Sequence, residues 1–196
     1  MSVLLTVSLS AALPLSAASH VDVVKMRTEN QVNPLGIGTS TPRFSWQITS
    51  DRKGVVQTSY QILVASSREK LDRNEADLWD SGERNSDEQL WIPYQGKALL
   101  SGAQAYWKVR ITTNRGKSEW TEPQLFTIGL LGETKWSGTW IGLEDLQPGE
   151  QKGMHTRLAA RYIRKDFAAK GKVKRAVAYV AGLGVYEFYV NGQRMG

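Results

Sequence analysis

The sequence predicts an all-β protein whose first domain is an immunoglobulin-like β-sandwich. Apolar and polar residues alternate with a period of two through about seven short segments between residues 21 and 130. Turn-forming residues separate these segments roughly every ten residues, as is typical of a sandwich of antiparallel strands. Helical periodicity is almost absent, so we expect packed sheets with little helix.

The candidate strands follow in chain order: VDVVKMRTE (21–29), RFSWQITS (43–50), YQILVASS (60–67), LWDSG (78–82), QLWIPYQG (89–96), AYWKVRITTNRG (105–116) and EWTEPQLFTIGL (119–130). In the second of them, Phe44, Trp46 and Ile48 alternate with polar residues, so one face of that strand is apolar. Residues 30–42 are rich in Pro, Gly and Asn and predict a loop that crosses between strands.

Three local signals define the connections. Pro93 cannot donate an amide hydrogen bond, so residues 89–96 are expected to form a short edge strand. Asn114-Arg115-Gly116 supplies the turn between the last two strands. Ser66 and Ser67 precede a short polar stretch and are expected to cap one helical turn.

One spacing favours the fibronectin type III variant of the sandwich. Leu100 precedes Tyr106 by six residues, just before the strand YWKVRI. This arrangement resembles a tyrosine corner, in which the Tyr hydroxyl bonds to backbone upstream. We therefore predict that Tyr106 ties the strand to the preceding loop, with Trp46 as its core partner.

The composition shifts after this domain, which we assign to residues 20–129. A linker with Trp136 and Trp140 spans residues 130–149, and β-type patterning resumes over residues 150–196. The later candidate strands are ARYIRKDF (160–167), KVKRAVAYVA (172–181) and GVYEFYVNG (184–192). Asn191-Gly192 is a strong hairpin turn signal, and its partner strand is expected beyond the end of this sequence.

The N-terminal residues 1–19 resemble a signal peptide. An uncharged apolar run ends in Ser16-Ala17-Ala18, which fits a small-x-small cleavage site, although no Lys or Arg precedes the run. The run is too short, and too interrupted by Pro14, for a stable membrane span. We expect an exported protein, periplasmic or at the cell surface. The sequence has no cysteine, which excludes disulfides, thiolate metal sites and a cysteine nucleophile.

The sequence offers no catalytic residue, no metal site and no cofactor motif. Its only histidines are His20 and His155, which match no catalytic or metal-binding pattern. The acidic residues concentrate between positions 69 and 88, in one segment interspersed with Arg and Lys. A glycosidase needs two carboxylates that face each other across a cleft, so this segment is interpreted as solvated surface. Gly182-Leu183-Gly184 lacks the third glycine and the helix of a dinucleotide-binding loop.

Charge and aromatic content suggest binding without defining a site. The net charge is +6, and much of it lies in residues 157–176, where basic residues alternate with apolar ones as on solvated strands. No nucleic-acid-binding motif accompanies them, so a nucleic-acid partner is not expected. Trp136 and Trp140 could stack on a sugar, but a role at a domain junction is favoured. Four tryptophans are assigned to the sandwich core or its edges: Trp79, Trp91, Trp107 and Trp120.

Three stretches in order resemble the N-terminal region of bacterial α-L-rhamnosidases. The first is MRTENQVNPLGIGTSTPRFSWQI, residues 26–48, although Gly38 stands where the family often has an acidic residue. The second is LWDSG (78–82) with YWKVRITTNRGKSEWTEPQLFTIGL (106–130). The third is WSGTWIG (136–142) followed by residues 160–196, which is similar to the entry of the family's jelly-roll domain.

This resemblance implies a fibronectin type III-like sandwich followed by an incomplete jelly roll. The family's general acid and its water-activating carboxylate belong to an (α/α)-barrel, and neither maps onto any position here. The chain is therefore expected to be an inactive, truncated portion of an inverting glycoside hydrolase that releases terminal L-rhamnose from glycans. Its expected partners are the catalytic domain of the parent enzyme and rhamnose-containing polysaccharide, and its substrate-binding residues stay unassigned.

Two alternatives are kept open. The chain could be a stand-alone carbohydrate-binding or adhesion module that uses exposed aromatic residues, or an interaction protein that docks by its edge strands. In either case we expect residues 21–129 to fold independently. Residues 150–196 on their own are expected to be poorly ordered or prone to association, because the few strands they supply cannot complete a jelly roll.

Overall fold

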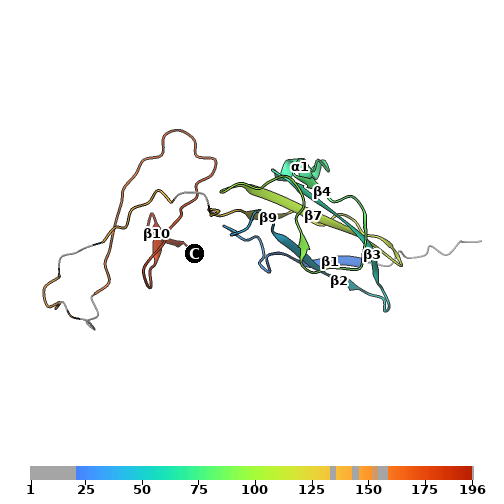
Figure 1. The fold of residues 1–196 in the computed structure, drawn as a ribbon, viewed down its shortest axis with the longest axis horizontal. Helices are drawn as coiled ribbons and strands as arrows, with labels where there is room; N and C mark the ends of the chain where they lie inside the picture. The colour runs from blue at the N-terminus through green and yellow to red at the C-terminus, as the bar shows by residue number, and fades with distance from the viewer. Residues whose placement is uncertain (1–20, 133–135, 143–145, 152, 154–158, 196) are drawn as a thin grey trace, which may run out of the picture. The chain divides into compact units, whose positions relative to one another are not determined.

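The computed structural model describes residues 21–132, 136–142, 146–151, 153 and 159–195 (Figure 1). The chain divides into two compact units, residues 1–137 and residues 138–196. The predicted signal peptide, residues 1–19, and both histidines lie outside the described residues. Within the described part of the chain, no helix is long and apolar enough to cross a membrane.

The described elements are almost entirely strands. In chain order they are β1 (Val21–Thr28), β2 (Arg43–Ser50), β3 (Gln57–Ala65), α1 (Arg68–Asp72), β4 (Trp79–Asp80), β5 (Arg84–Asn85), β6 (Ile92–Pro93), β7 (Gln104–Thr113), β8 (Gly116–Lys117), β9 (Gln124–Thr127), β10 (Phe188–Val190) and β11 (Gln193–Met195). The predicted all-β class is confirmed, and the first unit has an immunoglobulin-like fold.

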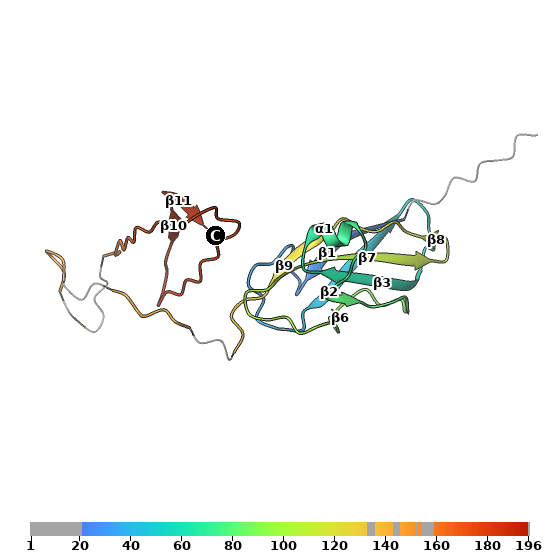
Figure 2. The same ribbon diagram turned by 90° about the horizontal axis from the view of Figure 1, so that it is seen from above.

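Two antiparallel sheets form the first unit (Figure 2). One has the strand order β1-β2-β6, and the other has the order β4-β3-β7-β8, with β5 also paired to β3 and β9 to β7. Of the strand expected over residues 119–130, only β9 is formed, and it pairs with the beginning of β7, whereas β8 precedes the expected strand and pairs with the end of β7. Pro123, which has no amide donor, stands directly before β9.

The core lies between the two sheets and is rich in aromatic rings. Phe44 is fully buried at its centre, as the alternation in β2 predicts. Its ring centroid lies 4.4 Å from that of Trp107 and 5.8 Å from that of Phe126. The rings of Trp79 and Tyr94 complete the cluster at 6.3 Å and 6.5 Å from Phe44. Strands from both sheets therefore meet in one continuous core.

A smaller apolar cluster lies between α1 and the outer face of β3 and β7. It consists of buried Leu63, Ala65 and Leu71 with half-buried Ala76, Tyr106 and Trp120. As predicted, Ser67 caps the helix, and its hydroxyl accepts the Lys70 N–H at 3.4 Å. The ammonium of Lys108 donates to the carbonyl of Leu71 at 2.5 Å and to Asn74 at 2.7 Å. Lys108 thereby attaches the helix to the sheet, which sequence patterning did not indicate.

The predicted tyrosine corner at Tyr106 is wrong. The Tyr106 hydroxyl accepts a hydrogen bond from the Gln104 side chain at 2.5 Å, and Leu100 is 73% exposed. The reason is the alternation of β7, in which Ala105 and Trp107 point into the core. Tyr106 therefore points to the outer face and cannot reach the loop on the core side.

A different tyrosine makes the backbone contacts that were expected of Tyr106. The hydroxyl of Tyr94 lies within hydrogen-bonding distance of two carbonyl oxygens, that of Lys97 at 2.8 Å and that of Leu78 at 3.3 Å, to which it can donate. Burial raises the pKa of Tyr94 to about 12, so its hydroxyl remains a proton donor at ordinary pH. Tyr94 therefore joins the segment after β6 to the segment before β4.

The second unit contains one hairpin among its described residues. β10 pairs with β11, and Asn191 and Gly192 form the turn with φ angles of 50° and 80°. The Asn-Gly turn prediction is thus confirmed, but the partner strand follows at once in residues 193–195 rather than beyond the sequence. Strands were also expected over residues 160–167 and 172–181, and the structure shows none there.

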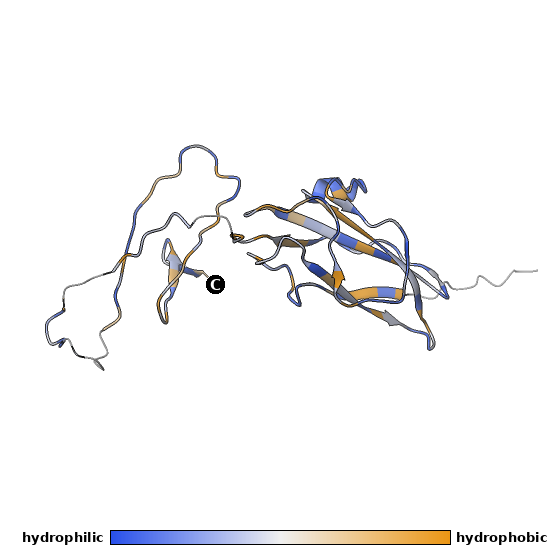
Figure 3. Cartoon of the chain, viewed as in Figure 1, coloured by the Kyte–Doolittle hydropathy of each residue, from blue (hydrophilic) through white to orange (hydrophobic). Residues whose placement is uncertain are grey.

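The segments expected to form these strands leave their apolar side chains exposed. Apolar residues recur along the second unit (Figure 3), yet Tyr162 and Phe167 are 95% and 81% exposed. A strand is stabilised by neighbours on its faces and edges, and in the described part of the chain residues 160–167 pair with no strand. Among the described residues of this unit, Glu150 and Arg161 form an ion pair at 2.5 Å in which both side chains are less than one-fifth exposed.

Glu83 predicts a pH dependence for the first unit. Its carboxylate accepts hydrogen bonds from the hydroxyl of Ser59 at 2.7 Å and from Lys117 and Thr112, which lowers its pKa to about 2. A carboxyl group with a depressed pKa stabilises the fold above its unfolded value of about 4.3. This contribution is lost as the pH falls from about 4 towards 2.

We expect the urea midpoint of the wild-type chain to fall more steeply between pH 5 and pH 2.5 than that of Glu83→Gln. The glutamine retains the shape of the side chain but cannot titrate. Parallel pH profiles for the two proteins would contradict the assigned role of Glu83.

Candidate functional site

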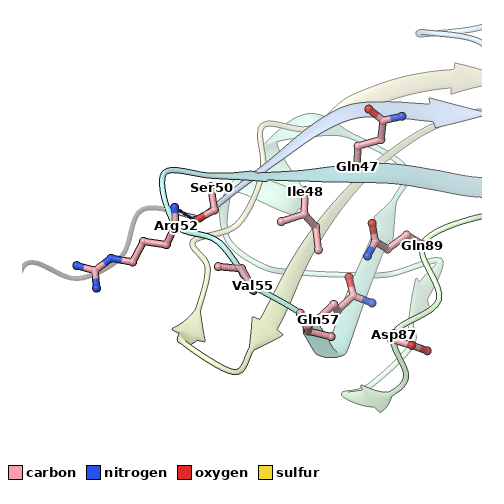
Figure 4. Close-up of a pocket in the computed structure, with 10 residues that line it drawn as sticks. Gln47, Ile48, Ser50, Arg52, Val55, Gln57, Asp87 and Gln89 are labelled. Atoms are coloured by element: carbon pink, nitrogen blue, oxygen red, sulfur yellow. Dashed lines mark hydrogen bonds between the residues drawn. The ribbon is translucent and has the colours of Figure 1, made fainter.

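The described structure contains an open pocket of about 560 Å³ at one end of the sandwich (Figure 4). It lies where the end of β2, the connection to β3 and the segment before β6 come together. Its lining consists of Gln47, Ile48, Ser50, Arg52, Gly54, Val55, Val56, Gln57, Asp87 and Gln89. The pocket therefore combines amide, hydroxyl and charged groups with three aliphatic side chains.

Gln57 forms a fixed wall of the pocket. The indole N–H of Trp46 donates to Gln57 Oε1 at 3.0 Å. In turn, Gln57 Nε2 donates to the carbonyls of Ser86 and Glu88, both at 3.0 Å. Gln57 is only 2% exposed, and both protons of its amide are used. It therefore holds residues 86–88 against β3 and is not available as a donor to a ligand.

Other polar groups around the pocket are free to bind a ligand. Within the described residues, the side chains of Gln47, Arg52, Asp87 and Gln89 make no hydrogen bond to protein. In Figure 4 the Gln89 side chain extends towards Gln57 and the side of β2 that carries Ile48, whereas Gln47 lies on the other side of the strand. Gln89 is therefore the free amide best placed to contact a molecule in the pocket.

Trp91 lies two residues beyond Gln89 and is held in a strained conformation. Its φ angle is 60°, which is a genuine outlier for a bulky residue. Its N–H donates to Ser45 Oγ at 3.0 Å, and the carbonyl of Gln89 accepts the N–H of Trp46 at 3.0 Å. Both residues are thus fixed alongside β2, while the Trp91 side chain is exposed.

Arg43 supports the indole of Trp91 and is itself held in place. Its guanidinium lies 4.0 Å from the ring centroid of Trp91. Two parallel bonds join the guanidinium to Glu29, at 2.7 Å and 3.1 Å, and the Arg43 N–H donates to the same carboxylate at 2.7 Å. These hydrogen bonds from Arg43 are the main reason why the pKa of Glu29 lies below its ordinary value. Glu29 and Arg43 together therefore fix the orientation of the Trp91 indole.

The acidic residues of positions 69–88 are dispersed, and several of them stabilise the fold. Asp77 pairs with Lys70 at 2.6 Å, and Glu83 joins β3, β7 and β8 as described above. Asp87 is the carboxylate that lines the pocket in the described chain. Among the residues searched, which exclude both histidines, no group of three His, Cys, Asp or Glu side chains could hold a metal ion.

The sequence interpretation missed the pocket and assigned Trp91 only to the core or edge. Trp136 and Trp140, considered as sugar-stacking candidates, are 49% and 69% exposed, and their role stays a prediction. Gln47 and Gln89 carry no sequence signal, because an isolated Gln in a β-segment is common. The available signal for Trp91 was alternation: Ile92 and Tyr94 are the buried positions of this segment, so Trp91 between Leu90 and Ile92 points away from the core.

Comparison with known proteins identifies both parts of the chain. Residues 23–132 match the family described as Rha78A-like, N-terminal immunoglobulin domain. Residues 171–196 match the alpha-L-rhamnosidase N-terminal domain. An alpha-L-rhamnosidase of Formosa agariphila is 35% identical over 193 residues, covering 91% of this chain and 20% of the relative. One from Alteromonas sp. (strain LOR) is 35% identical over 167 residues, covering 84% of this chain and 18% of the relative.

Two solved structures share the fold and part of the sequence. The alpha-L-rhamnosidase of Streptomyces avermitilis, complexed with L-rhamnose, matches with a TM-score of 0.59 and 36% identity over 63% of this chain and 12% of its own. That of Dictyoglumus thermophilum matches with a TM-score of 0.58 and 36% identity over 61% of this chain and 14% of its own. The chain spans about a fifth of the length of the curated relatives it matches.

The match to the immunoglobulin domain covers more than half of the chain, and the match to the alpha-L-rhamnosidase N-terminal domain follows it along the sequence. The chain therefore belongs to the α-L-rhamnosidase family, as a Rha78A-like N-terminal immunoglobulin domain followed by the start of the α-L-rhamnosidase N-terminal domain.

Proposed function

We propose that this chain is the non-catalytic N-terminal portion of an exported α-L-rhamnosidase and that it supports the catalytic domain. Its homology to the N-terminal region of α-L-rhamnosidases supports this role. The observation that carries the proposal is the exposure of apolar side chains in the second unit. Leu183 is 88% exposed and Val185 is fully exposed, although both belong to the segment that matches the rhamnosidase N-terminal domain.

These side chains make further β-structure the most favourable partner of the second unit. Burying one large aliphatic or aromatic side chain contributes about 1.5–3 kcal/mol. Several such side chains in residues 159–195 stand in solvent, including Tyr162 and Phe167. A polypeptide that supplied neighbouring strands would bury these side chains and order the segment. The parent enzyme would supply those strands between this region and its catalytic domain.

A domain-replacement experiment tests the supporting role. The N-terminal residues of the Formosa agariphila relative that align with this chain are deleted in one variant and replaced by this chain in a second. Soluble yield, Tm and hydrolysis of p-nitrophenyl α-L-rhamnoside are measured for both variants and for the intact relative. We expect deletion to lower yield and Tm and replacement to restore most of both.

The chain alone is measured in the same assay and is expected to release no p-nitrophenol. A deletion variant with the Tm and activity of the intact relative would contradict the supporting role. Hydrolysis by the chain alone would contradict its assignment as non-catalytic. The export proposal is tested separately by fractionating cells that carry the full coding sequence: recovery of the protein only from the cytoplasm would contradict it.

A further inference from the structure

We propose that one end of the immunoglobulin-like unit, where the chain leaves β9, is a docking surface for the parent rhamnosidase polypeptide beyond residue 196. The surface consists of residues 30–42, 98–103 and 128–132, and we call it the uncharged end. Its partner is an apolar protein surface that covers the side chains of Leu35 and Leu100. This inference rests on the proposed function and names the surface through which the support is given.

Three segments that are far apart in the sequence meet at this end. On one side of the segment that follows β9, Ile37 forms a parallel bridge with Ile128. On the side of β7, which pairs with β9, the N–H of Gly102 donates to the carbonyl of Ile128 at 3.0 Å. Residues 30–42 and 98–103 therefore flank the segment through which the chain leaves the sandwich.

Each flanking loop buries one large apolar side chain and exposes another. Ile37 and Leu99 belong to the core, whereas Leu35 and Leu100 are 78% and 73% exposed. A single exposed leucine is common on a protein surface and needs no explanation. Here two of them are carried by the loops on either side of one exit segment, which itself contains half-buried Leu131. The uncharged end therefore offers apolar surface from all three of its segments.

The backbone that carries Leu35 is fixed in position. The N–H of Gly36 donates to Thr127 Oγ1 at 2.8 Å, and Gly36 has a φ angle of 78°, which favours glycine. The two backbones approach so closely that a Cβ atom at Gly129 would lie 2.9 Å from the carbonyl oxygen of Gly36. A surface held in this way loses little conformational freedom when a partner docks on it.

Charge distribution favours a protein as the occupant. The three segments of the uncharged end contain no Asp, Glu, Lys or Arg. Next to them in the sequence stand Glu29, Arg43, Lys97 and Glu133, and the first two of these pair with each other at 2.7 Å. Depletion of charged residues is the compositional mark of the buried centre of a protein interface.

The opposite end of the sandwich differs in this respect. There the turn after β2 contains Asp51, Arg52 and Lys53, and the turn after β7 contains Arg115. The two turns meet, because the side chain of Asn114 donates to the carbonyl of Gly54 at 2.9 Å. Charge is thus concentrated at one end of the strands and missing from the segments at the other, so the uncharged end is the one suited to a protein partner.

The size of the surface favours a partner in the same polypeptide. A stable complex between separate proteins buries about 800 Å² on each partner, which is far more than two leucines and their neighbours supply. A covalently linked partner has a high effective concentration and needs less contact. This chain covers 20% of the length of the Formosa agariphila relative, so such a polypeptide is abundant in the family.

The test places Leu35→Asp and Leu100→Asp, separately, in the isolated chain and in the replacement chimaera described above. We expect neither substitution to change the Tm of the isolated chain, where both side chains stand in solvent. In the chimaera each should lower the Tm by about 2–4 °C, because a charge would be buried against an apolar partner. Unchanged Tm in both chimaera variants would overturn the proposal.

Leu90→Asp is the matched control, because Leu90 is 64% exposed and lies outside the uncharged end. It should leave the Tm of the chimaera unchanged, and a loss equal to that of Leu35→Asp would overturn the proposal. Hydrogen exchange supplies a readout without any substitution: residues 30–42 and 98–103 should exchange more slowly in the chimaera than in the isolated chain, while residues 51–56 should not. Equal rates in the two proteins over residues 30–42 and 98–103 would also overturn it.

The alternative occupant, a second copy of this chain, is separated by sedimentation of the isolated chain. A dimer that Leu35→Asp dissociates would make the second copy the occupant, and the proposal would be wrong. The outcomes also distinguish this inference from the supporting role. A chimaera no more stable than the deletion variant would contradict both, whereas one that regains Tm but is insensitive to both leucine substitutions would contradict the docking surface alone.

Discussion

Phe44→Ala is expected to lower the free energy of unfolding of the sandwich by about 3–5 kcal/mol, the usual range for truncating a buried aromatic ring. Phe44 has no exposed surface, and it packs against the rings of Trp79 in β4 and Trp107 in β7, which belong to the opposite sheet. Its removal would leave a cavity between rigid indole rings, which cannot collapse into the space. Urea unfolding followed by tryptophan fluorescence measures the change.

Phe44→Leu and Leu35→Ala are the controls for this prediction. The first retains most of the buried volume and should cost less than the alanine variant. The second truncates a side chain that is 78% exposed and should change the free energy of unfolding by less than about 0.5 kcal/mol. If Phe44→Ala cost no more than Leu35→Ala, Phe44 would not occupy the centre of the core.

Gly96→Ala is expected to destabilise the same domain by about 3 kcal/mol, the upper part of the range for overpacking. A Cβ atom at this position would overlap the carbonyl oxygen of Leu78 and the Cβ of Trp79, and would come within 2.5 Å of the Tyr94 hydroxyl. The overlapping carbonyl also accepts the N–H of Lys97 at 3.0 Å, so relief would break backbone bonding. Thermal unfolding measures the loss in Tm.

Gly38→Ala is the matched control, because a Cβ atom there would meet no heavy atom within 4 Å and the φ angle is not positive. We expect this variant to be as stable as the wild type or slightly more stable, since alanine reduces the freedom of the unfolded chain. A similar loss of Tm in both glycine variants would contradict the close approach at Gly96.

Most of the sandwich could be predicted because its strands are patterned by burial on one face. The alternation of Phe44, Trp46 and Ile48 located β2, and Pro93 placed β6 at an edge, where it pairs only with β2. Tyr106 was misassigned for a related reason. Spacing from Leu100 suggested a corner, but the register of β7 places Tyr106 on the outer face, and Tyr94 makes the backbone contacts instead.

The second unit shows where local patterning is insufficient. Residues 172–181 have the composition of a strand, but composition alone does not supply the neighbours that a strand needs. The turn at Asn191-Gly192 formed as predicted because its signal is local: both residues tolerate positive φ angles. The same contrast explains the pocket, whose lining depends on long-range hydrogen bonds such as those from the Gln57 side chain to the carbonyls of Ser86 and Glu88.

We expect the immunoglobulin-like domain to fold by itself and the start of the rhamnosidase N-terminal domain to need further polypeptide to fold. Hydrogen exchange of the isolated chain, read by mass spectrometry of peptides, tests this most directly. We expect strong protection in β2, β3 and β7 and exchange close to the unstructured rate across residues 159–187. Equal protection of the two regions would contradict the claim.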